Sequence, residues 1–452
     1  MSTAPLTPAR ERIEGHAPRF ASSPALAYRR RRAGRGATVA LAALISATKE
    51  AEDGDGLAAT LAIAGRALVE RQARLAARAG ARHIVILVER LPAALTAAVD
   101  RLRRAGIRVE VARSVADAAD HIHPEERVLL FADGAIAEEA LVGRLAGSPA
   151  PSLVVADEGS ETRHWERLDA AQRWSGLALI DGQTLRRTAG RLGEWDLAAT
   201  LMRQAVSSGA RRIGLADGAD TGPASFAALV LARSDADAVN ARTVRRSGWS
   251  AGTGWPARLL YPPLTRLVLP PLAVRAIEPV WLRLTALLLT LGALPAIAFD
   301  WWRTAVALIV VAMPLEAIAL GLASVHLQAA GASDRLARGR QLLLGLAVLL
   351  LGWRLTAVGG GWGCELAAAT LVAVMLALRL ARRIAGAMGL APLAWLADPD
   401  AVAWLMIVPA LAPQAERIWA AALVALLVYA LGSLLALLRT LASQDEPGLG
   451  AV

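Results

Sequence analysis

The sequence predicts a Rossmann-like α/β domain followed by an all-α bundle of six membrane-spanning helices. The 452 residues are 55% hydrophobic and 19% charged. This balance is too apolar for an ordinary soluble protein and too charged for a chain that lies wholly in a membrane. Short apolar runs alternate with helical segments up to residue 232, and apolar runs of membrane-spanning length follow from residue 281.

The first half of the chain has the alternation of strands and helices that builds an α/β domain, which we place at residues 37–232. Residues 1–36 are polar and are predicted to form a disordered lead. Apolar residues at three- and four-residue spacing predict helices at 57–79, 92–105 and 138–145. Because strands and helices alternate, we expect a mostly parallel sheet. Its expected strands are 38–45, 84–88, 109–112, 128–131, 153–156 and 177–180.

Two passages in this domain resemble the sugar-phosphate nucleotidyltransferases. They are LAIAGRALVERQARLAARAGARHIVILVERLP at 61–92 and FADG at 131–134, and residues 195–213 resemble the helix and strand that close the same fold. The resemblance implies a glycine-rich loop for nucleotide phosphates and a metal-binding aspartate at Asp133. In place of that loop stands SATKEAEDGDG, whose four carboxylates would repel a triphosphate. Asp133 is therefore either a retained Mg²⁺ ligand or a residue that caps the turn with Gly134.

The second half begins with a linker and a juxtamembrane amphipathic helix, at residues 233–280. Residues 261–279 place apolar side chains beside Arg266 and Arg275, as in helices that lie at a membrane interface. The membrane domain is predicted at 281–440 and a tail at 441–452. Its six expected spans are 282–299, 305–327, 342–358, 367–380, 401–411 and 418–438, of which the fourth and fifth are short for ~30 Å of hydrocarbon.

The distribution of arginine predicts the orientation. Arginines cluster after the second and fourth spans, which places the α/β domain and the C-terminus on the cytoplasmic side of a bacterial inner or plasma membrane. Trp301, Trp302, Trp353 and Trp362 suit the opposite interface. The formal charge of +10 is expected to meet the anionic leaflet of the lipid bilayer. We predict no nucleic-acid partner, because no basic stripe is interleaved with aromatic residues.

Glu316 is a lone carboxylate within the second apolar span, and an ionisable side chain there is a functional candidate by default. The six spans behind an interfacial helix resemble the CDP-alcohol phosphatidyltransferases. With the domain ahead of them, they resemble bifunctional enzymes that make a CDP-linked polyol and then transfer it. That family carries D-x-x-D-G-x-x-A-R followed by G-x-x-x-D-x-x-x-D, and its aspartates hold divalent metal. At those four positions this chain has Glu316, Ala319, Ala337 and Gln341.

One carboxylate cannot hold a pair of divalent ions, so we predict a membrane protein of phospholipid or polyol-phosphate head-group metabolism with lost or altered catalysis. It would be a pseudoenzyme or a regulatory partner. In that case Glu316 is protonated or paired with an arginine, for which Arg354 is the candidate. The resemblance also suggests a homodimer through the membrane domain.

Two alternatives stay open. The first is an active CDP-alcohol phosphatidyltransferase with a divergent site that uses Mg²⁺ or Mn²⁺ and a CDP-activated polyol or lipid phosphate. Its catalytic residues would be Glu316 and Asp334 and its metal ligands Asp133 and Glu316. Its phosphate-binding residues would be Arg335, Arg338 and Arg340. The second alternative is a small-molecule transporter.

Overall fold

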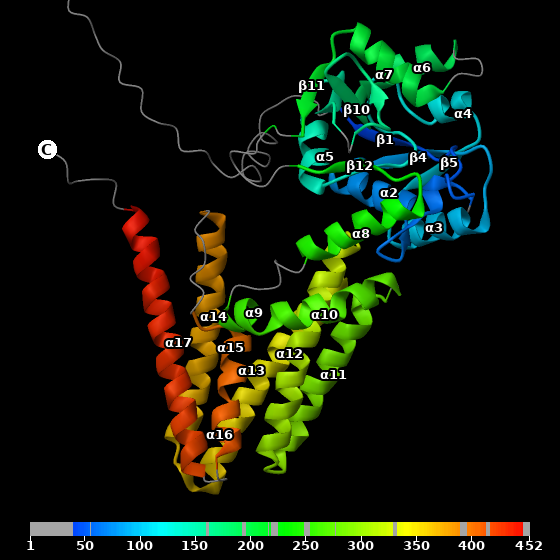
Figure 1. Ribbon diagram of the computed structural model, residues 1–452. Coiled ribbons are helices and arrows are strands. Elements are labelled where there is room, and N and C mark those ends of the chain that lie inside the picture. The colour runs from blue at the N-terminus through cyan, green and yellow to red at the C-terminus, as the bar shows by residue number, and fades with distance from the viewer. Residues whose placement is uncertain are drawn as a thin grey trace, which may run out of the picture.

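The structure, a computed structural model, has an α/β domain that stands on a bundle of long helices (Figure 1). This arrangement confirms the predicted fold class. The described residues are 39–54, 56–159, 162–191, 196–215, 217, 225–247, 254–275, 277–328, 332–388, 396–412 and 416–445. The predicted lead at 1–36 lies outside them, and so does most of the tail.

An eight-stranded mixed sheet forms the centre of the α/β domain, with strand order β11-β8-β10-β6-β1-β4-β5 and β9 paired to β10. All six predicted strands are present. The strands are β1 (Leu41–Ser46), β4 (His83–Leu87), β5 (Val109–Ala112), β6 (Arg127–Phe131), β8 (Ser152–Asp157), β9 (Glu166–Arg167), β10 (Gln172–Asp181) and β11 (Arg211–Gly214). The sheet is mostly parallel, as predicted, and the exception is β10, which runs antiparallel to β6, β8 and β9.

Helices cover both faces of this sheet, each with its own apolar core. One face carries α2 (Leu68–Arg78), α3 (Ala93–Arg104) and α5 (Glu139–Ala146), and the other carries α4 (Val115–Asp120), α6 (Gly182–Ala189) and α7 (Leu197–Ser207). Because helices bury both faces, the central strands are apolar without alternation, as in β1 and β6. The small strands β7 (Ala135–Ala137) and β12 (Ala227–Leu229) pair beside the main sheet.

The predicted helix 57–79 is wrong in its first half. Residues before α2 form a short 3-10 helix, η1 (Ala58–Thr60), and a hairpin of β2 (Ala62–Ile63) and β3 (Arg66–Ala67). The hairpin turns at Ala64 and Gly65, which have φ angles of 51° and 73°. A left-handed backbone at two successive residues ends an α-helix, and a glycine at the second makes it accessible.

Three helices connect the domain to the bundle: α8 (Arg233–Ser247), α9 (Trp255–Leu259) and α10 (Tyr261–Val274). Helices α9 and α10 lie across the end of the bundle that faces the α/β domain (Figure 1). We call this the domain-side end. Tyr261, Thr265 and Leu269 of α10 are buried against the bundle, whereas Arg266 and Leu267 are exposed. The amphipathic pattern of this segment is therefore realised as a helix.

The bundle contains five described helices that are long and apolar enough to cross a membrane, so the protein is an integral membrane protein. They are α11 (Pro279–Ala298), α12 (Trp302–Val325), α13 (Ala332–Leu355), α14 (Gly363–Ala387) and α17 (Glu416–Asp445). A π-helical turn, η3 (Thr356–Gly360), ends α13. The predicted fifth span forms two short helices, α15 (Pro399–Leu405) and α16 (Ile407–Leu411), and 13 residues reach only ~20 Å at ~1.5 Å per residue. The count of six spans stays a prediction.

The prediction that Trp302 belongs to an interfacial belt is wrong, because this residue lies in the bundle core. Its side chain is buried and packs edge-on against Trp419 of α17, with ring centroids 5.3 Å apart. Trp301, Trp353 and Trp362 are exposed, as residues of a belt would be. The burial of Trp302 follows from its partner in α17, which lies far away in the sequence.

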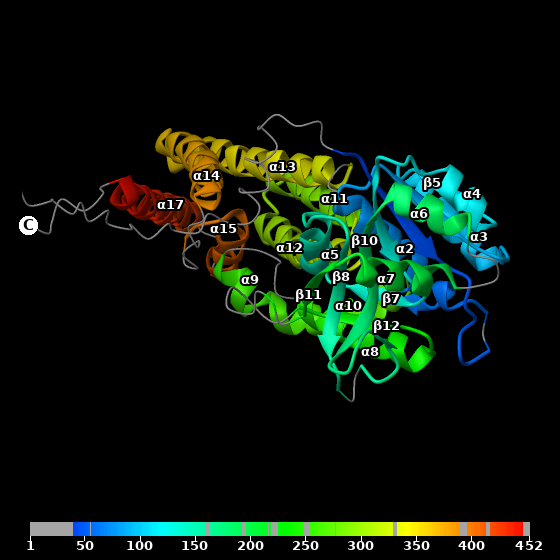
Figure 2. The same ribbon diagram turned by 90° about the horizontal axis from the view of Figure 1, so that it is seen from above.

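The α/β domain is docked on the end of α12. The guanidinium of Arg71 in α2 donates to the backbone oxygen of Val325 at 2.8 Å, and Arg78 donates to that of Gln328 at 2.9 Å. Buried His326 donates from Nε2 to the Ala64 oxygen in the β2–β3 turn at 3.2 Å. Seen from above, the domain stands over α11 and α12, while α14 and α17 extend to one side (Figure 2).

The docked state is expected to weaken in acid because of His326. Burial, aided by the charge of Arg66, lowers the pKa of this side chain from 6.5 to about 4. The released state therefore binds a proton first, so docking is fully stable above pH 6.5 and weakens as the pH falls toward 4, by up to ~1.4 kcal/mol per pH unit. Hydrogen exchange of the α2 amides between pH 7.5 and 5 measures this. His326→Gln should flatten the pH dependence, and an unchanged profile in that variant would contradict the assignment.

Candidate functional site

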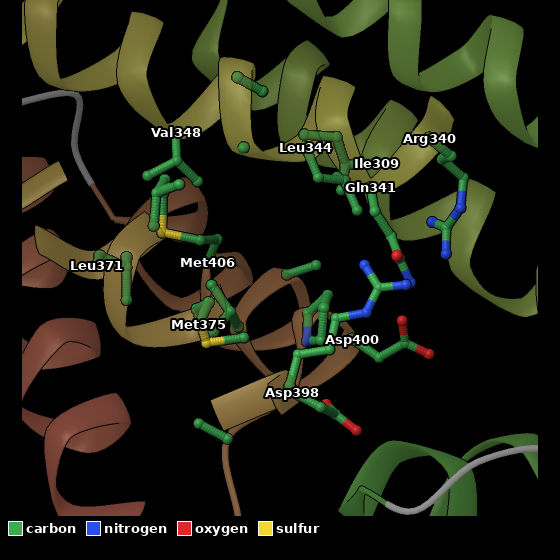
Figure 3. Close-up of a pocket in the computed structure, with 18 of the residues that line it drawn as sticks. Ile309, Arg340, Gln341, Leu344, Val348, Leu371, Met375, Asp398, Asp400 and Met406 are labelled. Atoms are coloured by element: carbon green, nitrogen blue, oxygen red, sulfur yellow. The ribbon is translucent and has the colours of Figure 1, made fainter. Parts of the chain in front are cut away.

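A cavity of about 630 Å³ opens within the bundle, between α12, α13, α14 and α15. Its polar and apolar residues are segregated. Arg340, Gln341, Asp398 and Asp400 gather at one end, whereas Val348 and other apolar side chains line the rest (Figure 3). The polar end is the domain-side end of the helices, since Arg340 lies in the first half of α13 and Asp398 immediately precedes α15.

Glu316 lies in the cavity wall between two arginines. Its Oε1 is 3.5 Å from Nε of Arg283 in α11, and its Oε2 is 3.8 Å from Nε of Arg340 in α13. The three residues are 8%, 3% and 5% exposed. The prediction of an arginine-paired carboxylate is thus realised with two arginines. Two cations around one carboxylate stabilise its negative charge and disfavour a divalent ion beside it.

The prediction that Arg354 pairs with Glu316 is wrong. Arg354 lies at the opposite end of α13, where its Nε donates to Asp300 Oδ1 at 3.1 Å and Nη2 to Oδ2 at 2.5 Å. A bidentate contact of this kind fixes the arginine to the α11–α12 joint. Sequence showed that both residues lie in apolar spans, but only the structure shows their different depths.

The predicted motif positions meet at the cavity in part. Glu316, Ala337 and Gln341 all line it, so the register of the resemblance brings the first, third and fourth positions together. Ala319 is buried and is not among the lining residues. The side chain of Asp334 lies outside the described part of the structure, although its backbone belongs to α13.

Of the three predicted phosphate-binding arginines, Arg340 lines the cavity. Arg335 and Arg338 are exposed on α13 and are not among its lining residues. Instead, Arg379, Arg382 and Arg383 of α14 contribute to the polar end. The sequence pattern of these arginines predicts only the orientation, because a basic cluster at the end of a span is typical of any cytoplasmic joint.

Two carboxylates of the polar end, Asp398 and Asp400, were not predicted. Asp398 caps α15 by accepting the backbone N–H of Ala401 at 2.6 Å. Asp400 accepts the hydroxyl of Tyr261 at 2.9 Å, and Trp404 Nε1 donates to the same hydroxyl at 3.1 Å. These contacts hold α10 against α15. The D-P-D sequence before an apolar run could have indicated the cap.

Asp133 lies in the α/β domain, just after β6, and is bound to the loop that follows β1. Its Oδ2 accepts the Ser46 hydroxyl at 2.5 Å and the Thr48 hydroxyl at 3.1 Å. Its Oδ1 accepts the backbone N–H groups of Thr48 at 2.7 Å and Lys49 at 2.9 Å. The carboxylate thus accepts four hydrogen bonds from this loop.

The described residues contain no group of three His, Cys, Asp or Glu side chains that could hold a metal ion. Asp133 and Glu316, the two predicted metal ligands, belong to different domains. The structure therefore does not bring them together in one site. Each is instead surrounded by donors: hydroxyl and backbone N–H groups around Asp133, and arginines around Glu316.

Replacing Asp133 with alanine is expected to loosen the 46–49 loop. The backbone N–H groups of Thr48 and Lys49 would lose their acceptor, at a cost of ~1–3 kcal/mol for each donor left unsatisfied. Thermal unfolding and hydrogen exchange of these amides measure the effect. Asp157, an exposed aspartate at the end of β8, provides the control, and Asp157→Ala should change neither. Equal effects in both variants would count against this role.

Comparison with known proteins gives a likeness for the α/β half. No family model matches the sequence, and no curated protein matches it. Among solved structures, the chain is similar to a protein from Bacillus anthracis assigned as a glucose-1-phosphate thymidylyltransferase, with 11% identity and a TM-score of 0.35 over 45% of this chain and 95% of that chain. It is also similar to the inositol-1-phosphate CTP transferase of T. maritima, with 12% identity and a TM-score of 0.33 over 43% and 90%. Both matches span somewhat less than half of this chain.

Proposed function

We propose that this protein binds a phosphate-bearing head group at the domain-side end of its bundle without transferring it, as a membrane partner or regulator of head-group metabolism. The observation that carries this proposal is Glu316 between Arg283 and Arg340. At a position where transfer chemistry would need clustered carboxylates and divalent metal, the chain places a cation on either side of a single carboxylate.

The charge of the polar end supports an anionic ligand. Four arginines, Arg340, Arg379, Arg382 and Arg383, face three carboxylates there, Glu316, Asp398 and Asp400. All three carboxylates are engaged by protein groups, whereas Arg379 and Arg383 form no ion pair within the described residues. Planar guanidinium groups match phosphate oxygens in pairs.

The α/β domain supports the same proposal. The hydroxyl and N–H donors of the loop at 46–49 are hydrogen-bonded to Asp133. A nucleotide phosphate would therefore have to displace a carboxylate that belongs to the chain. We propose that this domain is a docking platform, held on the cytoplasmic face by α2 and His326. The cluster of arginines at the domain-side end supports this orientation.

An assay for group transfer tests the proposal against an active enzyme. Full-length protein is incubated with CDP-diacylglycerol, a panel of polyol phosphates, and Mg²⁺ or Mn²⁺, and release of CMP is measured. We expect the full-length protein to release no more CMP than a Glu316→Gln variant does. The full-length protein should nevertheless bind a phosphate-bearing lipid. Release that depends on Glu316 would overturn the proposal in favour of a CDP-alcohol phosphatidyltransferase with a divergent site.

A further inference from the structure

The cavity is much longer than a head group requires. Along α12 its lining residues run from Leu320 to Trp302, which spans ~27 Å at ~1.5 Å per residue, and ~21 Å of this length lies between Glu316 and Trp302. Along α14 they run from Arg383 to Leu371, or ~18 Å by the same rise. One leaflet of a bilayer contributes ~15 Å of hydrocarbon. The cavity is therefore an elongated channel parallel to the helices, with a length typical of a hydrocarbon chain.

The chemistry of the lining changes along this length. Beyond the polar end, the walls consist of apolar side chains from facing helices, including Ile309, Leu344, Val348, Leu371, Met375 and Met406 (Figure 3). Methionine side chains at this position can adjust to an irregular apolar ligand. No charged residue lines the wall between Glu316 and Trp302 on α12, and this region of the helix is fully described. A free phosphate or a polyol phosphate would leave this apolar part of the cavity unused.

The polar end also carries a buried polar atom that has no hydrogen-bond partner among the described residues. This atom is Gln341 Oε1, and Gln341 lines the cavity. Arg340 lines the same end, where its Nε is 3.8 Å from Glu316 Oε2 but makes no hydrogen bond. Buried polar atoms are normally satisfied, so an unsatisfied amide oxygen beside this arginine is consistent with a ligand that has a polar head.

From this segregation we propose that the cavity holds a phosphate-bearing lipid, with its phosphate among the arginines and a hydrocarbon chain inside the bundle, alongside α12 and α14. This inference rests on the proposed head-group binding and adds to it the class of ligand and the path of its chain. Two observations indicate this ligand: the arginines at one end of the cavity complement a phosphate, and the apolar remainder is long enough for a hydrocarbon chain. The hydrocarbon chain of this lipid would lie inside the protein and not in the bilayer.

A cavity-filling substitution separates this inference from head-group binding alone. The full-length protein is exchanged into detergent, and the number of dioleoyl phosphatidic acid molecules bound per chain is measured by native mass spectrometry. Val348 lines the cavity, whereas its neighbour Leu349 faces outward and is 40% exposed. Val348→Phe should weaken binding at least tenfold, and the matched control Leu349→Phe should stay within twofold. Met375→Phe repeats the test from the facing helix if Val348→Phe does not fold.

The other arms identify the ligand. Dioleoyl phosphatidylcholine, which carries no net charge, should bind at least tenfold more weakly than phosphatidic acid, and so should inorganic phosphate. If Val348→Phe and Met375→Phe bind phosphatidic acid as well as the natural protein, the chain does not lie in the cavity and the inference fails. If inorganic phosphate binds as tightly as the lipid, the inference also fails, while the proposed head-group site survives.

Discussion

Replacing Glu70 with glutamine is expected to lower the free energy of unfolding of the α/β domain by about 3–5 kcal/mol. Glu70 in α2 is fully buried, and its carboxylate meets three arginines. Oε1 accepts from Arg66 at 2.6 Å and from Arg74 at 3.0 Å, and Oε2 accepts from Arg101 at 2.9 Å. Without the negative charge, Arg74 would stay buried with no counter-ion among the described residues, and Arg66 would keep only exposed Glu278, 3.7 Å away.

Glu70 should also make the stability of the α/β domain depend on pH in the acid range. Burial acts to raise the pKa of Glu70, but the charges and hydrogen bonds of Arg66, Arg101 and Arg74 outweigh it and hold this pKa below its ordinary value of 4.5. The unfolded chain takes up the proton first. The stabilisation is therefore fully present above pH 4.5 and is lost as the pH falls through the folded-state pKa.

Thermal unfolding of the Glu70→Gln variant from pH 7 to pH 3 measures both effects. The control is Glu50→Gln, which removes the partner of Arg90 in an exposed ion pair and should cost less than ~1 kcal/mol. A Glu70→Gln variant that is as stable as the Glu50→Gln variant would show that the arginines find water or other partners when the carboxylate is neutral.

Replacing Glu316 with glutamine should have a comparable effect on the bundle. Arg283 would then be buried among membrane helices without a negative partner in the described structure, and Arg340 would keep only the charge of Asp400 nearby. Breaking such a buried pair costs about 3–5 kcal/mol. If Glu316 serves as their counter-ion, removing one of the cations as well should relieve the defect. The double variant Glu316→Gln, Arg283→Gln is therefore expected to be more stable than Glu316→Gln alone.

Thermal unfolding in detergent gives the coupling energy of this cycle. Arg340 is left in place, because it also belongs to the proposed head-group site. Additive effects of the two substitutions would contradict the counter-ion role of Glu316, since independent sites show no coupling.

The strands of the α/β domain could be predicted because short, bounded apolar runs such as 128–131 leave few other interpretations. The antiparallel direction of β10 could not, because strand direction depends on how β10 meets β6 and β8 across the sheet. The helix expected at 57–79 was wrong because its apolar spacing continues through Ala64 and Gly65, whose left-handed backbone breaks it. Spacing alone does not reveal a hairpin of two-residue strands.

The sequence could predict individual residues of the site within apolar spans, but not which residues they contact. Glu316 was evident, since a carboxylate there is unusual. Its partners were not, because Arg283 and Arg340 lie on two other helices, and their depth depends on how α11 and α13 pack beside α12. Asp398 and Asp400 were missed because they lie at the N-cap and in the first turn of a helix of seven residues, which is too short for its periodicity to be recognised.

The central claim is that Glu316 is a counter-ion for two arginines and not a metal ligand. Electron paramagnetic resonance of the full-length protein with Mn²⁺ tests it most directly, by counting bound ions in the natural protein and in the Glu316→Gln variant. We expect the same number in both, because Arg283 and Arg340 disfavour a divalent cation beside this carboxylate. One Mn²⁺ per chain that is lost on substitution of Glu316 would contradict the claim.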